Sequence, residues 1–241
     1  MLLSIIVPSY NEPTLFKVID KIYSITFEKK INIEVVVVDD GSCEDMNDFF
    51  ELFATKYAGL RFIKHPVNMG KGAAVKTGIT NTTGDIIIIQ DADMEYDPGD
   101  IKKVIQPIVE RETLVCYGSR HKGKELRKRY FLLFKKHARH SLIPYLGGRL
   151  ITALCDMLFF ATLTDVLTGY KAFEAGFLKQ INLKSNGFEM EGELTAKVLK
   201  KTKITEVPIN FYPRTLQEGK KIRLKDGFRL LSTIIKFRFI S

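Results

Sequence analysis

The sequence contains few cysteines and no long apolar run. Its three cysteines, Cys43, Cys116 and Cys155, are far apart and form neither a Cys-x-x-Cys pair nor a metal-binding spacing. We therefore expect a reducing compartment and no disulfide framework. No stretch of about 18 apolar residues occurs, so no segment is predicted to span a bilayer clearly. Residues 1–8 lack the positive n-region and the cleavage site of a signal peptide, and we expect them to form a core strand.

Three nucleotide-binding signatures are also missing. No Gly-x-Gly-x-x-Gly motif follows the first apolar segment, residues 3–8, which argues against an NAD or FAD site. The Walker pattern is absent, so we do not expect a P-loop NTPase. The first strand is not followed by a glycine-rich loop, which disfavours a nucleotidyltransferase, although such an enzyme would share the topology and the metal-binding acids described below.

Charge is distributed unevenly along the chain. Residues 120–149 hold ten Lys or Arg and one acid, and residues 214–241 hold eight Lys or Arg and two acids. These segments carry net charges of +9 and +6, and because the whole chain carries +9, the remainder carries −6. A mildly acidic body with two basic segments predicts a surface that faces an anionic partner, such as phosphate, a membrane or nucleic acid.

Short apolar strands alternate with helical segments in the first half of the chain. Its 241 residues suit one large α/β domain or two small ones. The strands are expected at residues 3–8, 33–38, 60–64, 85–90 and 113–118, and the helices at 13–27, 45–57, 70–81 and 98–111. This alternation predicts a parallel, doubly wound sheet, in which ligands bind at the carboxyl ends of the strands.

Three acidic residues follow the most apolar of these strands. The run Ile86–Ile89 leads into Asp91, Asp93 and Glu95, which occupy every second position. Packing requires no acids there, and crowded carboxylates repel one another unless a cation lies between them. Oxygen ligands of this kind suit Mg²⁺ or Mn²⁺, which can hold the phosphates of a nucleotide. The alternative is a solvated acidic turn that closes a core strand.

Polar residues follow the other strands as well. Tyr10, after the first strand, can stack on a base, and Lys71 can meet a phosphate. An aspartate of the pair Asp39-Asp40 can accept a hydrogen bond from a base or a ribose, and Gly41 lets the backbone turn tightly. Each of these residues also fits a plain turn or a helix start, so none of them is specific alone.

The strand-end motifs gain specificity from their order. They are Pro-Ser-Tyr-Asn-Glu from residue 8, Val-Asp-Asp-Gly-Ser from residue 38, Asn-Met-Gly-Lys-Gly from residue 68 and Gln-Asp-Ala-Asp-Met-Glu-Tyr-Asp-Pro from residue 90. This ordered set resembles the inverting glycosyltransferases of family 2. It is most similar to the polyprenyl- and dolichyl-phosphate sugar synthases, which move a sugar such as mannose or glucose from a nucleotide to a lipid phosphate. The resemblance covers nearly the whole chain.

The resemblance implies a fold and a division of the chain. The fold is α/β, a Rossmann-like doubly wound sheet of the GT-A type that is mostly parallel, with C-terminal amphipathic helices. The catalytic domain would cover residues 1–213, and residues 120–163 within it would form basic, amphipathic helices near the membrane. Residues 214–241 would form an acceptor loop and a basic amphipathic helix.

The resemblance also assigns roles to individual residues. The nucleotide-sugar would be bound by Pro8, Tyr10, Glu12, Val38, Asp40, Lys71, Asp91, Ala92 and Asp93. A cofactor ion, Mg²⁺ or Mn²⁺, would be bound by Asp93 and by Glu95, where some family members carry Gln or Ser. Phosphate and acceptor groups would be bound by Arg120, Glu191, Arg214 and Lys220. The catalytic residues would be Asp91, Asp93, Asp165 and Arg120, with Asp165 orienting either the acceptor or a basic residue.

The implied reaction is the transfer of a hexose from a donor of the GDP-mannose or UDP-glucose type to a polyprenyl or dolichyl phosphate. A lipid phosphate is already anionic at about pH 7, so the reaction needs no strong general base. Catalysis would come from positioning two anions and neutralising the leaving diphosphate. The nearer alternative is a family 2 enzyme that acts on a soluble or polysaccharide acceptor.

Two segments bear on membrane binding. In residues 224–240, Lys225, Arg229 and Lys236 fall within about 40° of one another on a helix, which predicts binding to an anionic membrane surface or a core-packed helix with a solvated basic face. The apolar side chains assigned to the other side are Leu224, Phe228, Leu231, Ile234 and Ile235. Residues 150–167 fit a buried or dimer-forming helix as well as a membrane-touching one. We expect a peripheral protein on the cytoplasmic face of the membrane and leave a homodimer open.

A nucleic-acid-binding module is the alternative from a different class. Residues 126–136 interleave cations with aromatic side chains. That interpretation leaves the strand-end acids unexplained, and acids repel a phosphate backbone. We therefore expect no nucleic-acid partner.

Overall fold

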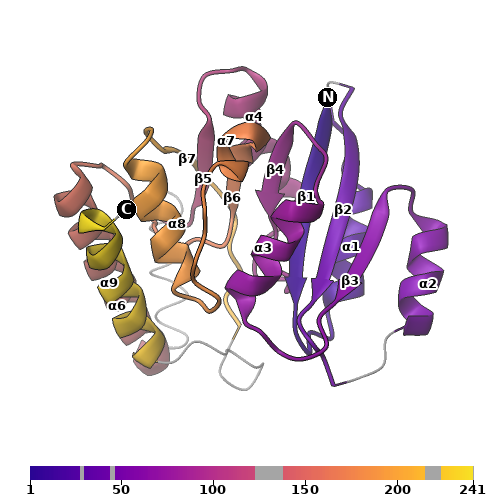
Figure 1. Ribbon diagram of the computed structural model, residues 1–241, viewed down its shortest axis with the longest axis horizontal. Coiled ribbons are helices and arrows are strands. Elements are labelled where there is room, and N and C mark those ends of the chain that lie inside the picture. Colours follow the sequence, from indigo (N-terminus) through magenta and orange to yellow (C-terminus); the bar gives the residue numbers. More distant parts are fainter. Residues whose placement is uncertain (28–29, 44–46, 123–137, 215–223, 241) are drawn as a thin grey trace.

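A mostly parallel sheet forms the centre of the computed structural model (Figure 1). The structure describes residues 1–27, 30–43, 47–122, 138–214 and 224–240, and within these ranges the sheet has seven strands. They are β1 (Leu2–Ser9), β2 (Asn32–Asp39), β3 (Leu60–Lys64), β4 (Ile86–Ile89), β5 (Val115–Ser119), β6 (Lys171–Glu174) and β7 (Thr205–Pro208). Their order across the sheet is β3-β2-β1-β4-β6-β5-β7. The strand order reverses between β1 and β4, which is where such sheets bind ligands.

The strands at the centre are buried on both faces. Residues 35–38 of β2 and 86–89 of β4 are β-branched and almost inaccessible to solvent, as expected for strands covered by helices on each side. Strand β1 pairs in parallel with both β2 and β4. Among the described strands, β6 runs against its neighbours β4 and β5. The predicted α/β, doubly wound and mostly parallel sheet is therefore confirmed.

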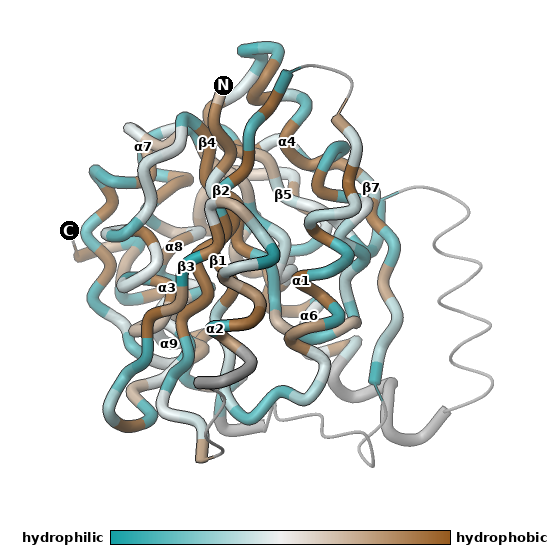
Figure 2. The backbone as a smooth tube through the Cα atoms, turned by 90° about the vertical axis from the view of Figure 1, so that its right-hand side faces the viewer, coloured by the Kyte–Doolittle hydropathy of each residue, from teal (hydrophilic) through white to brown (hydrophobic). Residues whose placement is uncertain are grey.

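Helices cover the two faces of the sheet (Figure 2). One face packs against α1 (Leu15–Tyr23), α2 (Asn47–Lys56) and α4 (Ile101–Val109), which follows the short helix η1 (Pro98–Asp100). The other face packs against α3 (Lys71–Asn81), α7 (Ala175–Lys179) and α8 (Met190–Leu199). The buried residues of α1 show the cause, because Leu15, Val18, Ile19 and Ile22 recur at helical spacing and form one apolar stripe.

Two helices form a flank beyond α8. Helices α6 (Ala138–Phe159) and α9 (Leu224–Phe239) enclose a small separate core with Ile151, Cys155, Leu230 and Ile234 (Figure 1). Helix α9 also makes extensive contact with α8. One face of α9 is thus packed on the protein. Within the described ranges, no helix combines the length and the hydropathy that crossing a bilayer requires.

The predicted elements of the first half agree with the structure to within a few residues. Two strands of the second half, β6 and β7, were not predicted. Each has four residues, and β6 includes Lys171 and Glu174, so neither resembles the apolar runs that mark the other strands. Their positions depend on pairing with β4 and β5, which are remote in the sequence.

Candidate functional site

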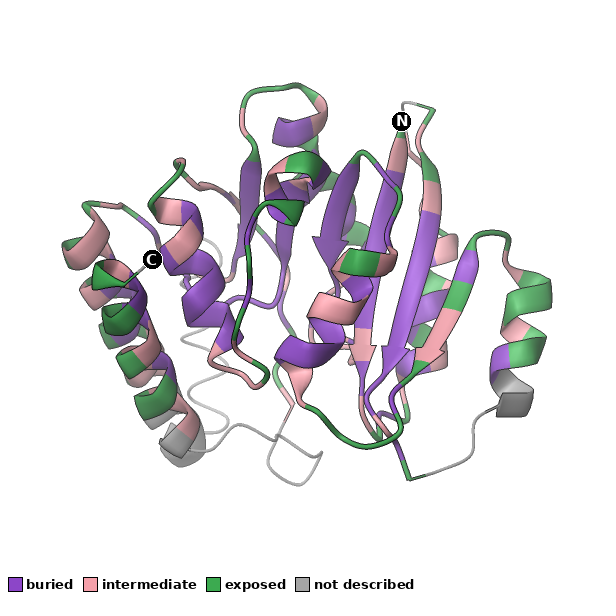
Figure 3. Cartoon of the chain, viewed as in Figure 1, coloured by how far each residue is buried: buried purple, intermediate pink, exposed green. Residues whose placement is uncertain are grey.

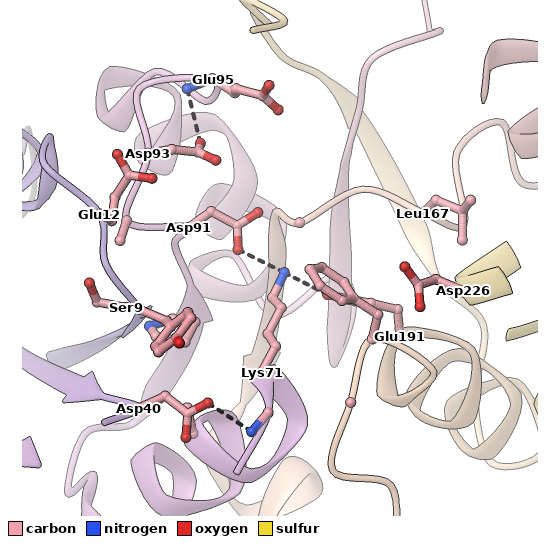
Figure 4. Close-up of a pocket in the computed structure, with 18 of the residues that line it drawn as sticks. Ser9, Glu12, Asp40, Lys71, Asp91, Asp93, Glu95, Leu167, Glu191 and Asp226 are labelled. Atoms are coloured by element: carbon pink, nitrogen blue, oxygen red, sulfur yellow. Dashed lines mark hydrogen bonds and ion pairs between the residues drawn. The ribbon is translucent and has the colours of Figure 1, made fainter. Parts of the chain in front are cut away.

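A pocket of about 440 Å³ opens at the carboxyl ends of the central strands (Figure 4). Its walls come from the ends of β1, β2 and β4, the start of α3, the segment that leads into α8, Arg214 and the first turns of α9. Twelve of the fifteen predicted site residues line this one pocket. They are Pro8, Tyr10, Glu12, Asp40, Lys71, Asp91, Ala92, Asp93, Glu95, Arg120, Glu191 and Arg214. Residues up to 206 positions apart in the sequence therefore meet in one place.

The other three predicted residues do not line the pocket. Val38 is fully buried in β2, and its side chain packs with Val36 and Ala74, so its predicted place in the nucleotide site stays a prediction. Asp165 is buried behind Arg120. Lys220 lies outside the residues that the structure describes.

The acids after β4 meet a cation from the far end of the chain. The Arg214 guanidinium lies 2.9 Å from Glu12 Oε2, 2.6 Å from Asp93 Oδ2 and 3.8 Å from Glu95 Oε1. Burial, together with the carboxylates of Asp91 and Glu95, raises the pKa of Asp93 to about 7, although Arg214 acts in the opposite direction. The guanidinium thus partly offsets the mutual repulsion of the acids.

These acids have the chemistry of a divalent cation site. In the part of the chain that is described, no group of three or more His, Cys, Asp or Glu side chains is already arranged around a metal position. Mg²⁺ commonly uses only one or two carboxylates and completes its shell with water and substrate phosphates. Asp93 and Glu95 can supply those carboxylates, and both already face one cation, Arg214. The residues present therefore fit Mg²⁺ or Mn²⁺.

A second charged cluster lies deeper in the pocket. Lys71 Nζ lies 2.7 Å from Asp91 Oδ1 and 3.0 Å from Glu191 Oε1 (Figure 4). Glu191 also pairs with the fully buried Lys171. Burial would raise the pKa of Glu191, but Lys171 and Lys71 hold it down at about 2. Burial lowers the pKa of Lys171 below its ordinary value despite Glu191. The cluster holds the Lys71 ammonium beside Asp91 on the wall of the pocket.

Arg120 is held rigidly by Asp165. Its Nε and Nη2 donate hydrogen bonds of 2.7 Å to the two carboxylate oxygens, and its backbone N–H donates to Asp165 as well. Burial opposes ionisation of Asp165, yet Arg120 keeps the pKa of Asp165 below its ordinary value. Glu206 accepts hydrogen bonds from the backbone N–H groups of Thr164 and Asp165 and fixes this loop. Of the two predicted roles for Asp165, orienting a basic residue is the one that this geometry supports.

The two aspartates at the carboxyl end of β2, Asp39 and Asp40, have different partners. Asp40 accepts hydrogen bonds from the N–H groups of Met69 and Gly70, and its Oδ1 lies 2.7 Å from His65 Nδ1. Asp40 therefore shapes the loop at the pocket rim. Asp39 Oδ2 is buried and has no hydrogen-bond partner among the described residues. Of the two aspartates, Asp39 is therefore the one with a carboxylate oxygen that can still accept a hydrogen bond.

Two glycines permit this geometry. Gly41 has φ +74°, and a Cβ atom there would collide with the backbone of Val67. A Cβ atom on Gly169 would collide with the carboxylate of Asp91. The tight turn predicted at Gly41 is confirmed.

With this geometry established, comparisons with known proteins identify the family. The family described as Glycosyl transferase family 2 matches residues 4–167, which include the strand-end motifs and the acids after β4. The chain belongs to this family. It is a glycosyltransferase, and the predicted resemblance is confirmed.

Several curated relatives of this glycosyltransferase have names that refer to lipid phosphates. A dolichol-phosphate mannosyltransferase of Pyrococcus furiosus is 28% identical, over 98% of this chain and 63% of its own length. A dolichyl-phosphate beta-glucosyltransferase of Trichomonas vaginalis is 24% identical, over 97% of this chain and 72% of its own length. A dodecaprenyl-phosphate galacturonate synthase of Rhizobium johnstonii is 26% identical, over 98% of this chain and 66% of its own length. The chain thus spans about two thirds of these relatives.

Solved structures agree with the fold of the glycosyltransferase. Glucosyl-3-phosphoglycerate synthase from Mycobacterium tuberculosis, in complex with Mn²⁺, uridine-diphosphate and glucosyl-3-phosphoglycerate, superposes with a TM-score of 0.70 at 21% identity, over 99% of this chain and 80% of that one. Its complex with Mg²⁺ and uridine-diphosphate gives a TM-score of 0.69 at 20% identity. This similarity supports the GT-A fold.

Sequence reasoning missed some pocket residues of the glycosyltransferase. Leu167, Phe188, Asp226 and Arg229 also line the pocket, and Lys171 supports it from behind. Phe188 lies three residues before Glu191, which was predicted to be in the site, and Arg229 belongs to the basic set predicted on the last helix. No local signal marks Lys171, whose partner Glu191 lies 20 residues away.

Proposed function

We propose that this glycosyltransferase moves a hexose from a GDP- or UDP-sugar to a polyprenyl or dolichyl phosphate while docked on an anionic membrane. The observation that carries the choice of a lipid acceptor is an exposed apolar surface on α6 and α9 that begins at the pocket. Asp226 and Arg229, in the first turns of α9, line the pocket, and the next exposed apolar side chain is Phe228. A lipid whose phosphate lies in the pocket would therefore find apolar protein surface beside it.

Large apolar side chains are exposed along the part of α6 whose burial the structure describes, next to the exposed Arg149. Leu146, Leu150, Met157 and the following Phe160 are 54%, 69%, 65% and 89% exposed. At about 100° per residue the three residues within the helix lie within an arc of roughly 40°, and Phe160 directly follows the helix. Exposed large apolar side chains that share one stripe mark an interaction surface, whereas single ones do not.

Helix α9 carries a second stripe. Phe228, Ile235 and Phe239 are exposed and lie within about 40° of one another, whereas Leu230, Ile234 and Phe237 are buried. Figure 3 shows this last helix with both buried and exposed parts. The apolar side predicted from sequence is thus wrong as a single face, because Ile234 is buried while Phe228 and Ile235 are exposed. Exposed Arg229 and Lys236 flank the outer stripe. Apolar side chains bordered by cations are typical of helices that lie on anionic lipid.

The pocket is suited to hold two anions together. Lys71, Arg120 and Arg214 bring positive charge to its walls, and the guanidinium of an arginine can contact a phosphate with two hydrogen bonds. Asp93 and Glu95 would hold Mg²⁺ or Mn²⁺, which when bound neutralises charge on a leaving diphosphate. Asp91, fixed by Lys71, lies where it can orient a sugar hydroxyl. A lipid phosphate brings its own negative oxygen, so no strong base is needed.

A donor screen tests this function. The purified chain is incubated with GDP-mannose or UDP-glucose, polyprenyl phosphate in anionic vesicles, and Mg²⁺ or Mn²⁺, and the lipid fraction is analysed by mass spectrometry. We expect a hexosyl lipid phosphate and flotation of the protein with the vesicles. Transfer only to soluble or polysaccharide acceptors, without flotation, would contradict the lipid acceptor. If the apolar surface instead joins two copies, sedimentation will show a dimer that does not float.

A further inference from the structure

The Arg214 guanidinium lies among the acids that would hold a metal ion. Its guanidinium contacts Glu12, Asp93 and Glu95 from one point, and the nearest distance, 2.6 Å, is to Asp93 Oδ2. All three carboxylates are largely buried. Mg²⁺ binds carboxylate oxygen at about 2.0–2.1 Å, so a metal held by Asp93 would share this carboxylate with the guanidinium. Two cations that share one carboxylate repel each other.

We propose that Arg214 is a built-in substitute for the metal: it neutralises the metal-binding acids in the empty enzyme and leaves Asp93 and Glu95 when metal and nucleotide enter together. This inference rests on the metal role of Asp93 and Glu95 in the proposed function. It also explains why the metal would bind together with the nucleotide and not alone, because the metal must displace a cation that the protein itself supplies.

The nucleotide makes the exchange favourable. When the metal enters alone, Arg214 loses carboxylate partners and gains none. When a nucleoside diphosphate enters with the metal, its phosphate oxygens offer the guanidinium new acceptors in the same pocket. Metal and nucleotide should therefore strengthen each other's binding, and the coupling must be equal in both directions.

The backbone is arranged so that only the side chain needs to move. The Arg214 N–H donates to Glu95 Oε1 at 2.8 Å, and the Tyr212 N–H donates to the Glu95 carbonyl oxygen at 2.8 Å. Phe211 forms a β-bridge with Tyr96. These contacts hold the start of the segment next to the acids.

The guanidinium itself is incompletely bonded. Its buried Nε has no hydrogen-bond acceptor among the described residues, since Glu95 Oε1 is 3.8 Å away. A buried donor without an acceptor lowers the cost of leaving this position. The side chain is thus anchored at its base and loosely held at one of its three nitrogens.

Mn²⁺ titrations followed by electron paramagnetic resonance test the exchange without measuring activity. The signal of free Mn²⁺ gives its affinity for the wild type, Arg214→Met and Arg214→Lys, each alone and with UDP or GDP. We expect weak binding to the wild type without nucleotide and at least about tenfold tighter binding to Arg214→Met, because no cation has to leave. Arg214→Lys keeps a charge and should stay close to the wild type. Arg111→Met, an exposed arginine at the end of α4, is the matched control and should change nothing.

The outcomes separate this inference from the proposed function. Suppose that the wild type binds Mn²⁺ with nucleotide, but that Arg214→Met and the wild type have the same affinity for Mn²⁺ without nucleotide. The proposed exchange is then wrong, whereas the metal role of Asp93 and Glu95 is retained. If no variant binds Mn²⁺ even with UDP and GDP, the metal role of Asp93 and Glu95 fails first. Adding Asp93→Asn to Arg214→Met should abolish the tighter binding, and its persistence would move the metal elsewhere. Thermal unfolding with and without Mn²⁺ gives a second measurement, in which Arg214→Met should gain more stability from Mn²⁺ than the wild type.

Discussion

Two surfaces of the molecule depart from the usual distribution of side chains in opposite ways. They are the inner wall of the pocket and the outer face of α6 and α9. The inner wall buries charge, with Lys171 fully inaccessible and paired to Glu191. The outer face exposes large apolar groups, including Phe160 and Phe239. Lysine is rarely buried, and apolar stripes are rarely exposed, unless partners compensate. Inside, the partners are other charges of the same chain, whereas outside we propose that the partner is lipid.

The largest expected effect comes from breaking the inner cluster. Glu191→Gln should lower the free energy of unfolding by about 3–5 kcal/mol, because it leaves the buried Lys171 unpaired. Urea unfolding at about pH 7 measures this loss, and Glu112→Gln at an exposed position is the control. A change below about 1 kcal/mol would show that the cluster contributes little.

The same variant should also change the response to acid. The folded pKa of Glu191, about 2, lies below the ordinary glutamate value of 4.5. A depressed carboxyl pKa contributes stability above the unfolded value, and that contribution is lost as the pH falls toward the folded value. The stability difference between wild type and Glu191→Gln should thus shrink between about pH 4.5 and pH 2. A difference that stays constant over this range would contradict the pairing.

Adjacent isoleucines of α9 give the sharpest comparison between packed and exposed faces. Ile234 is fully buried and Ile235 is 41% exposed. Ile234→Ala should cost about 2–5 kcal/mol of stability through the cavity it leaves, while Ile235→Ala should change stability by only about 0.5 kcal/mol. Vesicle flotation of the folded variants should weaken for Ile235→Ala alone. Equal loss of flotation in both variants would mean that folding, not the exposed face, controls lipid binding.

The exposed aromatic residues should matter for lipid binding and little for folding. Phe228→Ser with Phe239→Ser removes side chains whose full burial in an apolar phase is worth about 1.5–3 kcal/mol each. Partitioning onto vesicles should fall at least about tenfold, with the melting temperature nearly unchanged. Leu52→Ser, an exposed apolar residue on α2 at the other side of the molecule, is the matched control. The idea fails if the control lowers partitioning equally.

The smallest expected effect belongs to the cations beside the stripe. Arg229 and Lys236 should each contribute about fivefold to binding to anionic vesicles, so neutralising one of them, as in Lys236→Gln, should weaken binding by about that factor. The effect should fade at high salt and vanish on neutral vesicles, whereas the aromatic effect should persist in both. Unchanged binding to anionic vesicles would leave the apolar stripe as the main contact. Because Arg229 lines the pocket, Lys236→Gln alone is the cleaner variant for measuring turnover.

Most of the pocket could be predicted from the sequence because its residues stand at strand ends. Runs such as Ile86–Ile89 specify buried strands, and parallel strands bring their carboxyl ends to one edge of the sheet. The alternation of strands and helices is therefore enough to predict that the short motifs after those strands lie close together. The same logic explains why Arg120, after β5, was predicted correctly as a pocket residue.

What the sequence by itself determined is the alternating fold, its family and the acids and cations gathered at one edge of the sheet. Only the tertiary structure decided three things: that β6 inserts antiparallel between β4 and β5, that Arg214 reaches the acids after β4, and that α9 is apolar on two faces. The physical reason is common to all three. Periodicity and motif chemistry report the immediate neighbours of a residue in the chain, whereas pairing, ion contacts and burial depend on groups that only folding brings together.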